Sequence, residues 1–275
     1  MTRFTDLVSI IMPVYNGEQF IAEAIQSVVD QNYEYWELIV INDGSTDDTK
    51  RVILDFSDTR IRYFEQPNGG VSAARNLGIR EMRGKYLCCL DADDFLPPNS
   101  IFSRLNVFQS SDDISFVDGR VRIFDSTLTG AQSEWVPTFK GVPFYQLVRL
   151  NGRCFFGPTW MVKSESVGES LFDEKLSHGE DLLFYVSIAK KGIYDYTDEC
   201  ILHYRSNSNS AMSNFDGLAN GYSYLCSAIW RLYYTELSML DRILILFRSR
   251  KIMFLTFWSQ EEYLKAFKFV MLGHI

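Results

Sequence analysis

Little in this sequence points to the extracellular space or to a bound zinc ion. Its 275 residues contain five cysteines, an odd number, and no Cys-x-x-Cys pair occurs among them. Neither a disulfide framework nor a zinc site is therefore predicted. The first thirty residues lack the basic start and apolar core of a secretory signal peptide. We expect the protein to work in the reducing cytoplasm.

The chain also lacks an excess of positive charge. Lysine and arginine total 27 against 35 aspartates and glutamates, which gives a net charge of -8. Proteins that bind nucleic acids usually present a basic face, so we expect no nucleic-acid partner. A small anionic ligand that is held by a few local groups is compatible with this charge.

No uncharged run approaches the roughly 20 residues that a membrane-spanning helix needs. The stretch 242–258 mixes apolar runs with Arg242, Arg248, Arg250 and Lys251. Two interpretations are open. The helix can lie in a membrane interface, which would make the protein peripheral on the inner face of the cell membrane. Alternatively, it packs on the main domain or on a second subunit, as in a homodimer.

The first half of the chain alternates between strand-like and helix-like segments. Strands are predicted over 8–12, 36–41, 61–64 and 86–90, and helices over 20–29, 45–56 and 71–82. Asn16 and Gln19 form a potential capping box for the first helix, and Ser45 is expected to cap the second. Such alternation implies an α/β fold with a mostly parallel sheet and helices on both faces.

The second half of the chain is less regular. Two short strands are expected within 114–124, around Asp118 and Gly119, and no element is assigned over 125–160. A helix over 179–191 begins with acidic residues, as the helix dipole favours. Short strands are predicted over 193–196 and 201–205, and two or three apolar helices after about Asp216.

Polar segments follow the predicted strands, at the edge where ligands bind in such sheets. Asp91, Asp93 and Asp94 follow the strand 86–90. Their carboxylates lie so close together in the sequence that they repel one another. A divalent cation with oxygen ligands would balance their charge, and alternation along the chain sends Asp91 and Asp93 the same way. The alternative is a solvated acidic turn in which Asp94 caps the next helix.

Two more segments at this edge suit an anionic ligand. Asp43 ends the second strand and can accept a hydrogen bond from a base or a ribose, although Asn-Asp-Gly-Ser is also good turn chemistry. Gly69 and Gly70 precede the helix that carries Arg75, and a glycine-rich turn before a helix suits an anion. Arg75 can equally be an ordinary surface residue.

Four segments, in this order and with these gaps, resemble the family-2 glycosyltransferases of the GT-A fold. They are VSIIMPVYNGEQFI (8–21), WELIVINDGSTDDT (36–49), PNGGVSAARNLGI (67–79) and YLCCLDADD (86–94). The resemblance is strong over about residues 6–125 and continues to about residue 210. It implies a Rossmann-like GT-A domain over 1–215, with a nucleotide-binding half (1–125) and an acceptor-binding half (126–215), and a C-terminal helical region (216–275).

The resemblance also implies a UDP-sugar donor and a divalent metal ion, Mn2+ or Mg2+. Asp43 would contact the uracil, and Arg75 would lie near the nucleotide. Asp93 would hold the metal ion, and Asp91 would contact the ribose or the metal ion. Further nucleotide contacts are expected from Pro13, Tyr15, Glu18 and Ala92.

The segment SHGEDLLF (177–184) resembles the Glu-Asp motif of the family, which makes Asp181 the expected general base. An inverting transfer needs one carboxylate to take the proton of the acceptor hydroxyl; charge matching at a helix N-terminus is the alternative. Glu180 would support Asp181. His178 either binds the acceptor or is a surface histidine, and Trp160 either stacks on an acceptor sugar or belongs to the core.

The segment LHYRSNSNSAMS (202–213) resembles a late family segment, Tyr-Arg-x-His-x-x-Ser. Tyr204, Arg205 and Ser210 match it, and Arg205 would contact the diphosphate. The sequence departs from the pattern at Asn207, which stands in the place of the family's histidine. His203 is either a substitute ligand of the metal ion or a structural histidine.

Three functions are compatible with these motifs. The first is an inverting transfer of a hexose, of the glucose or galactose type, from a UDP-sugar to a hydroxyl of a lipid-diphosphate-linked saccharide in O-antigen or other surface polysaccharide synthesis. The second loads a sugar onto a polyprenyl phosphate, an anionic acceptor that needs no base, so Asp181 favours the first. The third is a non-catalytic sugar-nucleotide-binding subunit, which only the departure at Asn207 supports.

Overall fold

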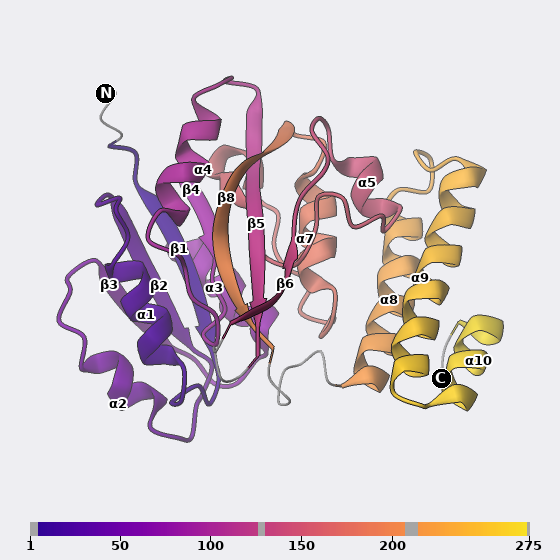
Figure 1. Ribbon diagram of the computed structural model, residues 1–275, viewed down its shortest axis with the longest axis horizontal. Helices are drawn as coiled ribbons and strands as arrows, with labels where there is room; N and C mark the ends of the chain where they lie inside the picture. Colours follow the sequence, from indigo (N-terminus) through magenta and orange to yellow (C-terminus); the bar gives the residue numbers. More distant parts are fainter. Residues whose placement is uncertain (1–4, 126–129, 207–213, 274–275) are drawn as a thin grey trace.

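The computed structural model describes residues 5–125, 130–206 and 214–273. These residues form an α/β fold around one eight-stranded sheet (Figure 1). The strands are β1 (Val8–Val14), β2 (Trp36–Asn42), β3 (Ile61–Glu65), β4 (Tyr86–Cys89), β5 (Ile114–Phe124), β6 (Ala131–Trp135), β7 (Met161–Lys163) and β8 (Ile193–Arg205). They follow the order β3-β2-β1-β4-β7-β5-β6, with β8 paired to β5.

The first four strands of the chain are parallel to one another. Strand β7 is antiparallel to both β4 and β5, so β5 runs in the same direction as β4. Strand β8 pairs with β5 in parallel. The carboxyl ends of β1, β2, β4, β5 and β8 therefore all lie at one edge of the sheet.

Helices cover both faces of this sheet, as predicted. They are α1 (Ile21–Val29), α2 (Thr49–Leu54), α3 (Val71–Glu81), α4 (Ser100–Phe108), α5 (Phe144–Val148), α6 (Ser164–Val167), α7 (Glu180–Ile188), α8 (Phe215–Leu232), α9 (Met239–Ser259) and α10 (Tyr263–Leu272). Successive side chains of a strand point to opposite faces. Accordingly, Ile10 and Met12 pack with α1 and α4 in one core cluster, whereas Ile11 packs with α5 and α7 in the other.

Two predicted helix caps are wrong because their side chains bind across loops. Helix α1 follows Phe20, and no side chain caps it. Asn16 adopts a left-handed conformation with φ of 51°, and its Oδ1 accepts the backbone N–H of Thr46 at 2.8 Å. Helix α2 begins only at Thr49, and the Oγ of Ser45 accepts the backbone N–H of Asn16 at 2.9 Å. These bonds tie the β1 loop to the β2 loop.

The predicted pairs of short strands are instead two long strands, β5 and β8. They pair along their length, with register shifts around Asp118 and Arg120. Gly119 lies where the two strands approach closely, because a Cβ there would be 2.6 Å from Ile201. The unassigned stretch 125–160 contributes β6 and α5.

The C-terminal helices are present, and α8 packs directly on the main core. Leu225 and Ile229 of α8 belong to the same core cluster as Phe184 of α7 and Phe116 of β5. The start of α8 forms a second cluster with α9 and α10. Within the described ranges, no helix combines the length and apolar character that crossing a membrane requires.

This shared core predicts that the C-terminal helices unfold together with the sheet. Ile229 is fully buried, so Ile229→Ala should lower the free energy of unfolding by about 2–5 kcal/mol in a single urea transition followed by fluorescence and circular dichroism. Leu232→Ala, on the same helix but 56% exposed, should change it by less than about 0.5 kcal/mol. A separate transition for the helices, with the main one unchanged, would contradict the shared core.

Candidate active site

The loops that follow β1, β2 and β4 bring the predicted donor-binding residues to one edge of the sheet. Val14 pairs with Asn42 at the ends of β1 and β2, and Ile11 pairs with Cys89 near the end of β4. Asp43 directly follows β2, and Asp91 follows β4 after one residue. The fold therefore gathers residues that are far apart in the sequence.

Asp43 is 3% exposed and holds the glycine turn that precedes α3. Its Oδ1 accepts hydrogen bonds from the side-chain amide of Gln66 at 2.7 Å and from the N–H of Gly69 at 2.9 Å, and its Oδ2 accepts the N–H of Gly70 at 2.8 Å. Gly70 has a φ of 86°, a conformation that favours glycine. The predicted turn of Asn42 to Ser45 is also present, because the N–H of Ser45 donates to Asn42 Oδ1 at 2.9 Å and Gly44 has a φ of 76°. The contact of Asp43 with a uracil stays a prediction.

Arg75 connects the loop after β4 to α7. It is 2% exposed, so the surface interpretation is wrong. Its Nη1 donates to Glu180 Oε1 at 2.7 Å, and its Nη2 donates to Asp91 Oδ1 at 2.8 Å. Burial opposes the charge, but Asp91 and Glu180 raise the pKa of Arg75 well above its ordinary value. The guanidinium therefore stays charged and fixes both carboxylates.

Asp181 lies beside this network at the start of α7. Its Oδ1 accepts the backbone N–H of Leu182 at 2.7 Å. Burial, and then the neighbouring charge of Glu180, raise the pKa of Asp181 to about 7, although Arg75 opposes the shift. A carboxylate with a pKa near neutrality is well matched to general-base work.

Arg205, at the end of β8, reaches the acidic loop after β4. Its backbone N–H donates to Asp94 Oδ1 at 2.8 Å, and its Nε donates to the Asp93 carbonyl at 3.0 Å. Its Nη2 pairs with Glu23 of α1, and the guanidinium lies 4.6 Å from the Phe20 ring centre. Asp94 is thus bound to Arg205, and it does not cap α4, which begins at Ser100.

The remaining predicted donor contacts surround the same edge. Tyr15, just past β1, is 53% exposed, so its ring is open to a ligand. Pro13 is buried within β1, and Ala92 is half-buried between the two acidic residues. Glu18 is exposed, and its Oε2 accepts the backbone N–H of Asp48 at 2.8 Å.

The acidic edge suits a divalent cation only with help from a substrate. Within the ranges described here, no group of three or more His, Cys, Asp or Glu side chains could hold a metal ion. Asp91 and Asp93 nevertheless supply the hard oxygen ligands that Mg2+ and Mn2+ take. One or two protein carboxylates are typical when substrate phosphates complete the coordination, so this donor set fits a cation that arrives with a diphosphate.

Two aromatic residues with alternative roles, Trp160 as an acceptor contact and His203 as a metal ligand, pack against other rings. Trp160 is 1% exposed, with its ring stacked on Tyr185 at 4.3 Å, so the core interpretation is confirmed and no face is open to a sugar. His203 packs edge-on against Phe95 and Phe124, as a structural histidine does. The segment positions Asn207 and Ser210 lie outside the described residues.

His178 is not a surface residue, because α8 packs against its loop. It is 9% exposed. A Cβ at Gly221 would lie 2.6 Å from the His178 carbonyl, and one at Gly217 would lie 2.7 Å from its ring carbon Cε1. Only glycine at these two positions lets α8 approach this closely. In the sequence, the spacing of four residues between these two glycines is the pattern that indicates close packing along one side of the helix.

Helix α8 also brings Tyr222 near the expected base. Burial, and then the charge of Asp181, raise the pKa of Tyr222 to about 12. Tyr222 packs against core clusters on both sides of α8. The candidate site therefore includes a residue of the C-terminal helices, which the sequence interpretation kept apart from the chemistry.

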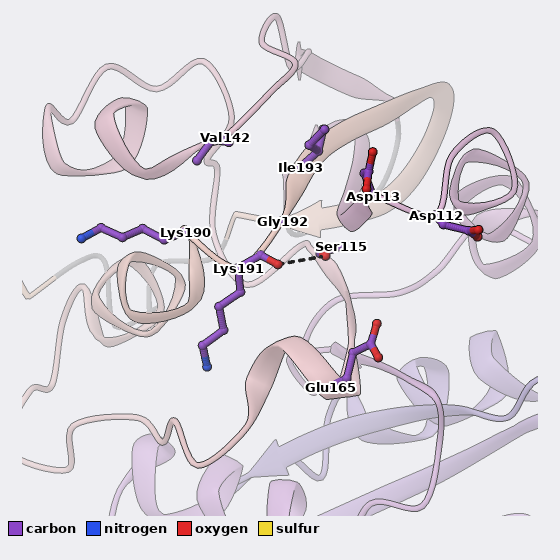
Figure 2. Close-up of a pocket in the computed structure, with 9 residues that line it drawn as sticks. All are labelled: Asp112, Asp113, Ser115, Val142, Glu165, Lys190, Lys191, Gly192 and Ile193. Carbon is purple, nitrogen blue, oxygen red and sulfur yellow. Dashed lines mark hydrogen bonds between the residues drawn. The ribbon is translucent and has the colours of Figure 1, made fainter.

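A separate hollow of about 470 Å³ lies at the opposite edge of the sheet (Figure 2). Ser115 near the start of β5 and Ile193 at the start of β8 line it. Its lining carries both signs of charge, from the acidic residues Asp112, Asp113 and Glu165 and from the basic residues Lys190 and Lys191. This hollow takes no part in the candidate site.

The comparisons with known proteins agree with this geometry. The family model described as "Glycosyl transferase family 2" matches residues 9–171. This match covers more than half of the chain. The protein therefore belongs to glycosyl transferase family 2.

Several bacterial proteins resemble it in sequence. An uncharacterized glycosyltransferase of Haemophilus influenzae is 36% identical over 188 residues, which are 67% of this chain and 72% of that protein. The putative teichuronic acid biosynthesis glycosyltransferase TuaG of Bacillus subtilis is 28% identical over 242 residues, 86% of this chain and 93% of TuaG. The matched part is only 27% of an uncharacterized glycosyltransferase of Rickettsia bellii, which is 34% identical over 68% of this chain.

Solved structures share the fold at low sequence identity. TarS 1–349 of S. aureus, in complex with UDP-GlcNAc, matches 97% of this chain and 92% of its own with a TM-score of 0.66 and 15% identity. The mannosyltransferase PcManGT of Pyrobaculum calidifontis, in complex with GDP-Man and Mn2+, has a TM-score of 0.64 and 16% identity, and covers 99% of this chain and 77% of its own. The predicted GT-A fold with C-terminal helices is confirmed.

The close approach of α8 to the His178 loop yields a prediction. Gly221→Ala places a methyl group against the His178 carbonyl, and this backbone must shift together with the start of α7. A displacement near 1 Å can cost about 10²-fold in turnover. We expect a comparable loss of kcat for sugar transfer, with UDP affinity unchanged by calorimetry.

Asn220→Ala is the matched control, because Asn220 is an exposed neighbour on α8. It should retain the turnover of the unmodified protein. Full activity of Gly221→Ala would show that α8 does not position the base.

Proposed function

We propose that this protein is a metal-dependent inverting glycosyltransferase that moves a hexose from a UDP-sugar to a hydroxyl of a lipid-diphosphate-linked saccharide. The observation that carries the proposal is the network of Asp91, Arg75 and Glu180. It brings Asp181, a carboxylate whose pKa is raised to about 7, next to the acidic edge of the sheet. Glu180, the neighbour of Asp181, and Asp91 bind the two terminal nitrogens of one guanidinium, which supports a base and a leaving-group site close together.

The donor would lie across the loops that follow β1, β2 and β4. Tyr15 is exposed and can stack on the uracil, and Asp43 would contact its polar edge from the glycine turn. Arg205 would exchange its pairing with Glu23 for contact with the diphosphate. The complexes of TarS with UDP-GlcNAc and of PcManGT with GDP-Man concern similar folds, which supports a nucleotide sugar as the donor class.

A divalent cation, Mn2+ or Mg2+, would be held by Asp93, with Asp91 beside it. When bound, such an ion supplies positive charge to the departing diphosphate, so that no second protein acid is needed. Arg75 keeps Asp91 in place at 2.8 Å. The PcManGT complex contains Mn2+, which supports this assignment.

Asp181 would act on the acceptor. It takes the proton of the attacking hydroxyl while this oxygen bonds to the anomeric carbon and the bond to the diphosphate breaks on the opposite face. One such displacement inverts the configuration, and its transition state is oxocarbenium-like. Glu180 supports the base through Arg75, and His178 shapes the loop that carries it.

The acceptor class follows from the need for a base. A hydroxyl must lose a proton, whereas a phosphate acceptor is already anionic, so Asp181 favours a saccharide over polyprenyl phosphate. TuaG is named for teichuronic acid biosynthesis, which supports synthesis of an O-antigen or another surface polysaccharide. We assign a glucose- or galactose-type sugar to the donor and the cytoplasmic face of the cell membrane to the reaction.

Asp181→Asn tests this proposal. The amide keeps the shape of the side chain but cannot take a proton, so transfer to a saccharide acceptor should fall by about 10²–10⁴-fold. UDP affinity in the presence of Mn2+ should stay the same in calorimetry. Retained transfer to a polyprenyl phosphate acceptor would identify the other transferase class, and unchanged transfer to a saccharide would exclude Asp181 as the base.

The raised pKa of Asp181 also predicts a pH profile. The base works when deprotonated, so kcat/KM for the acceptor should fall about tenfold per pH unit as the pH drops below about 7. This limb should be missing from the residual activity of Asp181→Asn. A profile that is flat down to pH 5 would contradict the assignment.

A further inference from the structure

Helix α9 exposes apolar side chains along one line. Met239, Ile243, Phe247 and Leu255 are between 54% and 70% exposed, and a spacing of four residues makes successive positions of such a line neighbours on the helix surface. Lys251 occupies the fourth position of this line, between Phe247 and Leu255, and is also exposed. The side of the helix that normally meets water is therefore apolar with one basic residue.

The buried side of α9 is already used for packing. Ile245, Met253 and Phe257 are fully buried, and Met253 and Phe257 pack against Leu218 of α8 and Phe269 of α10. The exposed line is therefore not needed for the fold of the C-terminal helices. A line of exposed apolar side chains that the fold itself does not use calls for a partner.

Helix α10 extends the same surface. Leu264, Phe267 and Met271 are 88%, 56% and 75% exposed. The rings of Trp258 on α9 and Phe267 lie 6.1 Å apart, and Trp258 also contacts Tyr263 at 4.7 Å. The exposed faces of α9 and α10 are thus continuous, and we call them together the C-terminal apolar face. Soluble monomers rarely expose apolar patches beyond a few hundred Å².

The charge around this face has the opposite sign to the rest of the chain. Residues 239–273 contain six lysines and arginines against three aspartates and glutamates, whereas the whole chain carries -8. One of the three acids, Asp241, is buried and paired with Arg149. Lys251 and Lys268 are exposed on the face itself. Exposed lysines among exposed apolar side chains are complementary to an anionic lipid surface.

We propose that the C-terminal apolar face docks on an anionic phospholipid surface, with α9 and α10 lying in its interface. Leucine, phenylalanine and methionine side chains would enter the acyl boundary, and Trp258 and Tyr263 would lie at the headgroup level, where such rings are favoured. Lys251 and Lys268 would contact lipid phosphates. A second copy of the chain fits less well, because self-pairing of the face would bring lysines of like charge together.

The docked face would lie near the candidate site. Helices α9 and α10 form the end of the molecule opposite β3 (Figure 1). Lys265 of α10 pairs with Asp216 at the start of α8 at 2.7 Å, and Gly217 in the next position faces His178. An acceptor that is anchored in the lipid would thus meet the loop that carries Asp181. Only this role rests on the proposed function, because the docking itself does not depend on it.

Sedimentation with vesicles tests the docking without any donor or acceptor. The full chain should bind vesicles made of an equal mixture of phosphatidylglycerol and phosphatidylcholine, and salt should release it. Its binding to vesicles of phosphatidylcholine alone should be much weaker. The double variant Phe247→Asp, Leu264→Asp should lower the partition coefficient by at least about tenfold. Both side chains are exposed, so the fold should survive, as circular dichroism would verify.

Leu54→Asp with Val142→Asp is the matched control. These residues are 58% and 54% exposed and lie outside α9 and α10, so vesicle binding should not change beyond a small electrostatic effect. Lys251→Glu with Lys268→Glu should weaken binding to the anionic vesicles roughly tenfold or more and leave binding to neutral vesicles unchanged.

Three results would overturn the docking. The first is a full chain that binds neither vesicle, and the second is binding that the control pair abolishes as strongly as the Phe247 and Leu264 pair. The third is a chain that binds no vesicles but forms a dimer in sedimentation velocity, with the dimer dissociated by the double variant Phe247→Asp, Leu264→Asp. This result would assign the face to a second copy of the chain. UDP affinity of the same variants distinguishes these outcomes from failure of the proposed function, since it should stay unchanged in all of them.

Discussion

The ion pairs of Arg75 hold the candidate site together. A buried guanidinium needs carboxylate partners, because an unpaired charge in the interior costs several kcal/mol. Here the partners come from two distant parts of the chain, Asp91 after β4 and Glu180 at the start of α7. The electrostatic requirement of one side chain thus fixes the acidic edge relative to Asp181, which no single segment of the chain could do.

A second constraint on Asp181 comes from the packing of the C-terminal helices. Helix α7 begins immediately after the His178 loop, and α8 packs on that loop through Gly217 and Gly221. Close packing of this kind transmits displacement, since interiors have few voids to absorb it. The position of Asp181 therefore depends on Arg75 and on α8. Helices α9 and α10, which carry the C-terminal apolar face, pack on α8 in turn.

The sequence predicted those parts of the molecule that depend on local patterns or on family motifs. The alternating segments predicted a mostly parallel sheet, and the family motifs predicted that Asp91 and Asp181 belong to one site at the carboxyl edge of this sheet. The predictions that were wrong concern residues whose partners lie far away in the sequence. Asn16 resembled a helix cap, but its side chain binds the loop of Thr46. Long pairing between β5 and β8 overrode the turn signal at Asp118 and Gly119, and the glycine spacing on α8 acquires meaning only when His178 packs against it.

A nucleotide diphosphate site at the acidic edge of the sheet is the central claim, and calorimetric titration of UDP tests it most directly. We expect binding with Mn2+ that is lost with EDTA and much weakened in Asp93→Ala, because phosphate and carboxylate oxygens together complete the coordination. Absence of UDP binding with and without Mn2+ in a folded protein would contradict the claim. Equal binding with EDTA would contradict the role of Asp93.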